Sequence, residues 1–172
     1  MKVDLVAGVT PVSLGSVEQT AAELTDLIKQ CGHAEPDLGV HVSAREAAEI
    51  AHRSSAGLLA VVRGPAADPA LLLGVLTTGS LRDPLAKQFD SDIRETAEGH
   101  TAHGYPVAFV ERVVTAEQLR AGSPFDCQLQ AVVADPDHSR LAVFTLSSTT
   151  GRGWLEVSAV FGRLVSSVDF RD

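Results

Sequence analysis

The sequence lacks any concentration of basic residues. Lys and Arg together number 14 against 22 Asp and Glu, which gives a formal net charge of -8. No run of Lys and Arg of the kind that marks a nucleic-acid-binding tail occurs in the chain. Binding to nucleic acid draws much of its affinity from cationic side chains on phosphates, and binding to anionic lipid depends on the same attraction. We therefore expect neither nucleic acid nor a membrane as a partner.

Cysteine and long apolar runs are also scarce. Cys31 and Cys127 are the two cysteines, and their wide separation is unlike the framework of a disulfide-stapled secreted domain. No stretch approaches the ~18 consecutive apolar residues of a membrane span. Asp4 and Pro11 interrupt the apolar N-terminal segment, which therefore does not resemble a signal peptide. We predict a cytoplasmic protein with two buried thiols.

Apolar residues and alanine are plentiful. The chain has 172 residues, of which 45% are hydrophobic, and this is enough for one buried core without metals or disulfides. We expect a single domain. Arginine outnumbers lysine and alanine is abundant, a composition typical of actinobacterial genomes rich in G and C.

Four segments have helical spacing. Apolar residues repeat every three or four positions between Ser16 and Cys31, and Gly32 is a suitable end for that helix. Ser43 and Glu46 form a capping-box pattern that predicts a helix over 44–53. Two further stripes predict an amphipathic helix over 81–98 and a closing helix, with Leu81, Leu85, Phe89 and Ile93 on the first and Trp154, Val157, Phe161, Leu164, Val165 and Val168 on the second.

The remaining apolar segments predict β-strands. Their expected ranges are 58–63, 71–78, 105–114, 125–134 and 140–148, with a connection over 115–124. The last two strands form a hairpin whose turn holds Asp135, Asp137 and His138. Strands that follow one another closely in sequence favour antiparallel pairing. We predict an α+β fold, an α/β/α sandwich in which helices cover both faces of a largely antiparallel β-sheet.

Three segments resemble the PsbP-like family. They are "GYPVAFVERV", "DCQLQAVVADPDHSRLAVFTLSSTT" and "WLEVSAVFGRLVSSVDF", which match that family's order of a strand after a glycine turn, a long hairpin and a closing helix. The family includes a photosystem accessory subunit, a Ran-binding import factor and actinobacterial LpqN-type proteins. The resemblance implies a PsbP-like core over residues 56–172, with residues 1–55 as an N-terminal helical addition. It also implies an accessory or adaptor function, without binding residues that can be carried over.

The segment "EGHTAHG" holds the most suggestive polar pair, His100 and His103. Two histidines at this spacing can supply two ligands to zinc, but a site needs further ligands. Gly99 and Gly104 bracket the pair and make the backbone permissive. We expect an exposed loop without a bound metal.

Other candidate residues have simpler structural explanations. Ser147, Ser148, Thr149 and Thr150 lack the Gly-x-Ser-x-Gly pattern of a hydrolase nucleophile and are typical of a turn and a helix N-cap. The glycines of "GRGWLE" open a helix that could hold an anion. Cys127 has no basic neighbour in sequence, which favours a structural thiol, and Trp154 is expected in the core.

Three functional hypotheses follow. The first is a non-catalytic accessory or adaptor domain that binds another protein, or a second copy of itself, through a face or edge of the sheet. The second is a small hydrolase or lyase with His100 or His103 as the base, in a pocket between the sheet and the N-terminal helices. The third is a small-ligand carrier that uses the same pocket. The first predicts no catalytic residue, cofactor or metal.

Overall fold

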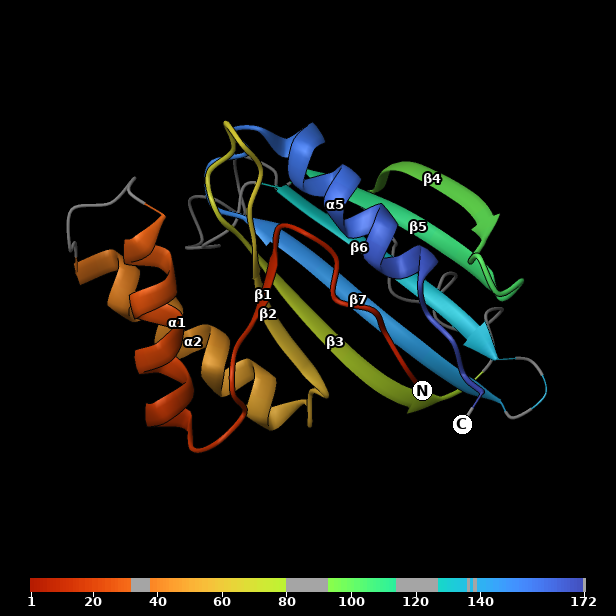
Figure 1. Ribbon diagram of the computed structural model, residues 1–172, viewed down its shortest axis with the longest axis horizontal. Coiled ribbons are helices and arrows are strands. Elements are labelled where there is room, and N and C mark those ends of the chain that lie inside the picture. Colours follow the sequence, from red (N-terminus) through yellow and green to blue (C-terminus); the bar gives the residue numbers. More distant parts are fainter. Residues whose placement is uncertain (32–37, 80–92, 114–126, 136, 138, 172) are drawn as a thin grey trace.

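The computed structural model describes residues 1–31, 38–79, 93–113, 127–135, 137 and 139–171. In these residues the chain forms a seven-stranded antiparallel sheet, in the order β1-β2-β3-β7-β6-β5-β4 (Figure 1). The strands are β1 (Val9–Pro11), β2 (Leu58–Val62), β3 (Ala70–Thr78), β4 (Ile93–His100), β5 (Pro106–Val113), β6 (Cys127–Asp135) and β7 (Arg140–Ser148).

The hairpin of β6 and β7 lies at the centre of this sheet. Its register runs from Cys127 opposite Ser148 to Asp135 opposite Arg140, and β3 continues the sheet along the other side of β7. Residues of both strands are buried on both faces, as in the apolar pairs Val133↔Ala142 and Ala134↔Leu141. Central strands with two apolar faces need cover on both sides. The predicted strands and the hairpin between them are confirmed.

Helix α5 (Trp154–Ser166) covers one face of the sheet, which we call the α5 face (Figure 1). Its buried residues, Val157, Val160, Phe161, Leu164 and Val165, contact a core that includes residues of β2, β3, β6 and β7. Phe161 is fully buried, as predicted, whereas Trp154 at the first turn is half-buried. The expectation that Trp154 lies in the core is met only in part, because the indole packs against the margin of the core where the helix begins.

Helices α1 (Val17–Gln30) and α2 (Leu38–Arg53) cover the opposite face where β2 lies. Leu24 and the alanines of α2 pack there against Leu59 and Val61. Alanine removes little apolar area but permits a close approach of helix and sheet. Helices therefore cover both faces, and the predicted α+β sandwich with an antiparallel sheet is confirmed (Figure 1).

The N-terminal residues join the sheet before α1 begins. Strand β1 pairs with β2, and Lys2 forms an isolated bridge with Asp169 near the C-terminus. The division into residues 1–55 and 56–172 within a single domain stays a prediction. No helix in the described ranges has both the length and the apolar composition that crossing a bilayer requires.

The helix predicted over 81–98 is wrong in its last part. Residues 93–100 form β4, which pairs with β5, while residues 80–92 lie outside the described part of the chain. Apolar residues are few in this segment, and Ile93 and Ala97 have a spacing that fits one helix face. An edge strand needs one hydrogen-bonded neighbour and tolerates polar residues, so pairing with β5 outweighs a weak helical pattern.

The capping box predicted at Ser43 is also wrong. Helix α2 begins at Leu38, so Ser43 lies inside the helix. An N-cap residue needs a non-helical backbone, and each residue added upstream of Ser43 contributes another helical hydrogen bond. A capping box does occur in α1, where Ser16 Oγ accepts from the Gln19 N–H and Gln19 Oε1 accepts from the Ser16 N–H, each at 3.2 Å.

Candidate binding groove

A groove lies on the α5 face, between the first turns of α5 and the strands at the β4 edge. Its volume is about 310 Å³. We call it the α5 groove, and its lining comprises Ala97, Phe109, Glu111, Leu129, Trp154, Leu155 and Ser158.

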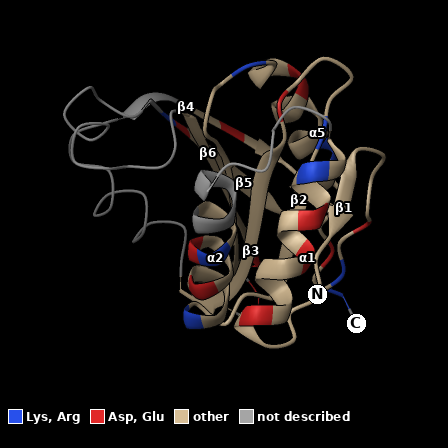
Figure 2. Cartoon of the chain, turned by 90° about the vertical axis from the view of Figure 1, so that its left-hand side faces the viewer, with Lys and Arg blue, Asp and Glu red and all other residues tan. Residues whose placement is uncertain are grey.

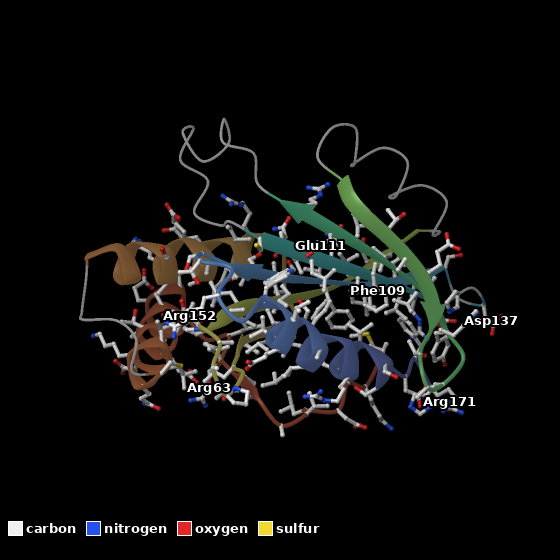
Figure 3. The ribbon with its side chains drawn as sticks, turned by 90° about the horizontal axis from the view of Figure 1, so that it is seen from above. Arg63, Phe109, Glu111, Asp137, Arg152 and Arg171 are labelled. Carbon is white, nitrogen blue, oxygen red and sulfur yellow. The ribbon has the colours of Figure 1, made fainter. Side chains whose placement is uncertain are left out.

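Strand register places the floor residues together. Ala97 of β4 lies opposite Phe109 of β5, and Glu111 lies opposite Leu129 of β6. Successive side chains alternate between the two faces of a strand, so Phe109 and Glu111 share the α5 face while Arg112 belongs to the opposite face. Figure 3 shows Phe109 and Glu111 along β5, beside α5. The floor is therefore apolar apart from one carboxylate.

A hydrogen bond joins α5 to the floor of the groove. Trp154 Nε1 donates to Glu111 Oε1 at 2.7 Å, across 43 positions of sequence. The Phe109 ring meets the buried Phe161 ring edge to face, with centroids 6.5 Å apart. These contacts fix the positions of two aromatic rings and a carboxylate on the wall and floor.

Ser158 contributes a second polar atom to the groove. It follows Trp154 by four residues and therefore lies on the same side of α5, one turn further along. Its hydroxyl oxygen is buried and has no hydrogen-bond partner, the one side-chain atom in the described residues with that property. A buried polar atom without a partner destabilises a fold and calls for an explanation.

Leu155 projects into solvent at the rim of the groove. It is 83% exposed, more than Leu5 at 56% and Leu76 at 46%. A single exposed leucine is common on protein surfaces, but here it adjoins an apolar cavity with two aromatic rings. The apolar surface of the groove thus continues outward onto the helix.

The two histidines predicted as an exposed pair lie outside the described lining of the α5 groove. His100 ends β4 and His103 lies in the turn after it, and both are exposed. The turn is held by hydrogen bonds, including one from the Ala102 N–H to the Ser166 carbonyl at 2.9 Å. No group of three or more His, Cys, Asp or Glu side chains that could hold a metal occurs among the described residues. The expectation that these histidines bind no metal stays a prediction.

The C-terminal residues surround His103 with charge. His103 Nδ1 lies 2.8 Å from Arg171 Nη2 and 3.8 Å from Asp169 Oδ2. Hydrogen bonds from the Arg171 side chain, and then from its backbone, hold the pKa of Asp169 well below its usual range. The same contact raises the pKa of Arg171. Figure 3 shows Arg171 at the far end of the molecule from Arg152, which lies just before the first residue of α5.

The hairpin turn has a structural role. Asp135 is 3% exposed and accepts two hydrogen bonds from Arg140, whose guanidinium also donates to the Phe170 carbonyl and lies over the Phe170 ring. Asp137 is exposed, and His138 lies outside the described residues. The buried carboxylate and its arginine therefore join the hairpin to the C-terminal segment.

The other candidate residues also stabilise local structure. Ser148 Oγ accepts from the backbone N–H groups of Thr150 and Gly151, as the prediction of a turn requires, but the N-cap of α5 is Gly153. Gly153 has φ +71°, which favours glycine. Cys31 and Cys127 form no disulfide and are half-buried instead of fully buried.

Two further cavities lie on the side of α1 and α2. One of about 260 Å³ lies between α2 and the sheet, where the enzyme and carrier hypotheses placed a pocket. Neither His100 nor His103 belongs to its described lining, which is Ala47, Ile50, Leu59, Leu71, Leu73, Gln128, Thr145 and Ser147. The other, about 390 Å³, lies between α1 and α2 and is lined by charges of both signs, among them Asp26 and Lys29.

Sequence reasoning missed Glu111, Ser158 and Leu155 as site residues. Two signals were present: Phe109 and Glu111 alternate onto one face of a strand, and Trp154 and Ser158 are spaced by one helical turn. Leu155 also lies off the apolar stripe of its helix. The contact between Trp154 and Glu111 depends on the tertiary fold and has no signature in sequence.

The chain is similar to known proteins in structure but matches none of them in sequence. No family model matches the chain, and no curated protein sequence matches it. The solution structure of cyanobacterial PsbP (CyanoP) from Synechocystis sp. PCC 6803 is similar to it with a TM-score of 0.37 and 15% sequence identity, over 60% of this chain and 74% of that chain.

Proposed function

We propose that this domain is a non-catalytic accessory module that binds another protein through the α5 groove. The observation that carries the proposal is the exposed side chain of Leu155 at the rim of an apolar cavity. Protein interfaces combine apolar and aromatic anchors at their centre with a polar rim, and tryptophan is enriched among the residues that dominate their energetics. Leu155, Trp154 and Phe109 provide such anchors.

The chemistry of the groove supports binding. Glu111 is the one titratable side chain in its described lining, and one of its oxygens already accepts from Trp154. Acid–base catalysis usually brings two or more titratable groups together in one cavity. The two candidate histidines are instead placed in or beside the turn after β4.

The net charge supports a protein as the partner, and the cysteines support a cytoplasmic location. The net charge of -8 favours a protein partner over nucleic acid or an anionic membrane. Figure 2 shows Asp and Glu positions interspersed with Lys and Arg along α1 and α2, so a basic face does not form on the side in view. Cysteines that form no disulfide support a cytoplasmic location.

Site-specific photo-cross-linking tests the proposal. A benzophenone amino acid replaces Leu155 in one variant and Leu5, a second exposed leucine far from α5 in sequence, in the control. After irradiation in cells of the source organism, we expect a discrete cross-linked protein from position 155 that is absent from position 5. Identical products from both positions, or none from position 155, would contradict the proposal. Cross-linking of position 155 to a second copy alone would replace the foreign partner with self-association.

A further inference from the structure

We propose that the α5 groove receives a lysine side chain of the partner protein. Its ammonium group would lie between the Glu111 carboxylate and the Ser158 hydroxyl, with its aliphatic stem along the apolar wall. This inference rests on the proposed function and specifies the chemistry that the groove recognises.

Charge favours a cation in this position. The described lining contains one carboxylate and no Lys, Arg or His. The whole chain carries a net charge of -8, which also attracts a basic segment during encounter. A carboxylate at the floor of an apolar groove gains a partner when a cation enters, because the low-polarity surroundings strengthen the attraction.

Two oxygen atoms without a donor in the described part of the chain belong to residues that line the groove. Glu111 Oε1 accepts from Trp154 Nε1, whereas Oε2 has no donor among the described residues. Ser158 Oγ is buried without a partner, so it reaches the cation by rotation of the side chain toward the groove. An ammonium group carries three N–H donors and accepts nothing, so it can satisfy both oxygens at once. The unpartnered hydroxyl, which the fold itself does not explain, then has a role in the bound state.

The same geometry favours lysine over arginine. A guanidinium binds a carboxylate best through two parallel hydrogen bonds, one to each oxygen. Here the indole of Trp154 already donates to one oxygen, so a forked guanidinium has to share that oxygen with the indole, while a compact ammonium needs only the other. The rings of Trp154 and Phe109 and the side chain of Leu129 offer apolar surface to the four-carbon stem, and aromatic rings also attract cations.

The fluorescence of Trp154 reports directly on this groove. Trp154 is the single tryptophan of the chain. The probe is a capped leucine–lysine–leucine tripeptide, and its matched analogue carries norleucine in place of lysine. We expect a saturable change in emission with the lysine peptide in the millimolar range or tighter, a weaker response to norleucine, and a weaker response to an arginine peptide.

Three variants separate this inference from the function on which it rests. E111Q and S158A should weaken lysine-peptide binding, E111Q by about tenfold or more because a charged hydrogen bond is lost. E98Q removes the same charge from the neighbouring strand, where Glu98 lies opposite Ala108 on the other face, and should leave binding unchanged. Equal binding of the lysine and norleucine peptides, no response to either, or equal losses in E111Q and E98Q would overturn the inference. The cross-link from position 155 would survive all three results, and its failure would instead contradict the proposed function.

Discussion

At the scale of single residues, we predict opposite effects of Ser158→Ala on stability and on binding. Its buried hydroxyl has no partner in the described structure, and removing such a group relieves a desolvation penalty. Ser158→Ala should therefore raise the free energy of unfolding by about 1 kcal/mol, helped by the better helix propensity of alanine. Urea denaturation followed by circular dichroism measures the change.

Ser167 gives the matched contrast. Its hydroxyl donates to the Leu164 carbonyl at 2.7 Å and accepts from the Asp4 N–H at 3.0 Å. Ser167→Ala should lower the free energy of unfolding by about 1 kcal/mol, since both bonds are lost. If Ser158→Ala destabilised the protein as Ser167→Ala does, the hydroxyl of Ser158 would have a partner within the fold, and its availability to a ligand would be disproved.

Asp169 gives the stability of the protein a dependence on pH. Hydrogen bonds from Arg171 lower the pKa of Asp169 in the folded chain, so the ionised carboxylate stabilises the fold above its unfolded pKa of about 3.9 and this contribution is lost as pH falls below that value. Asp169→Asn should be less stable than the parent at neutral pH, and the difference should shrink toward about pH 3.

Denaturation midpoints at the two pH values measure the effect of Asp169. Asp137→Asn is the control, because Asp137 is exposed in the hairpin turn, and it should change little at either pH. A difference between Asp169→Asn and the parent that stays constant down to low pH would show that the contact with Arg171 does not depend on the charge of Asp169.

At the scale of elements, α5 combines a buried side with a side available for binding. Phe161 is fully buried, and its truncation to alanine should cost about 3–5 kcal/mol of folding free energy. Trp154→Ala should cost less because the indole is half-buried. Leu155→Ala should stay within about 0.5 kcal/mol of the parent. Thermal or urea unfolding of the three variants gives the order, and a loss at Leu155 as large as that at Phe161 would mean that Leu155 packs in the core.

Elements with strong apolar patterns could be predicted from sequence. The hairpin arms β6 and β7 and helix α5 have enough buried residues for the spacing of apolar positions to identify two strands and a helix. The segment of β4 does not: Ile93 and Ala97 suit a helix face as well as a strand, and pairing with β5 decides between them. The α5 groove was beyond prediction for the same reason, because it joins Glu111 of β5 to Trp154 of α5 through a tertiary contact.

At the scale of the whole molecule, the sheet separates two different surfaces. On one side α1 and α2 pack against β2 through small residues, and on the other α5 leaves a groove over β4, β5 and β6. The chain ends meet where Lys2 pairs with Asp169, at the end of the C-terminal segment that follows α5. A partner in the groove would therefore contact the β4 side of the molecule, away from α1 and α2 (Figure 1).

The most direct test of the central claim measures the affinity of the cross-linked partner for the purified protein, with and without a charge at the groove rim. Leu155→Asp places a carboxylate on the exposed apolar rim without touching the core, and Leu5→Asp places the same charge at an exposed leucine far from α5 in sequence. Isothermal titration calorimetry should show binding weakened by about tenfold or more in Leu155→Asp and unchanged in Leu5→Asp, since an apolar anchor residue in an interface is worth about 1–2 kcal/mol or more. Equal affinity of the parent and both variants would contradict the assignment of the α5 groove as the protein-binding surface.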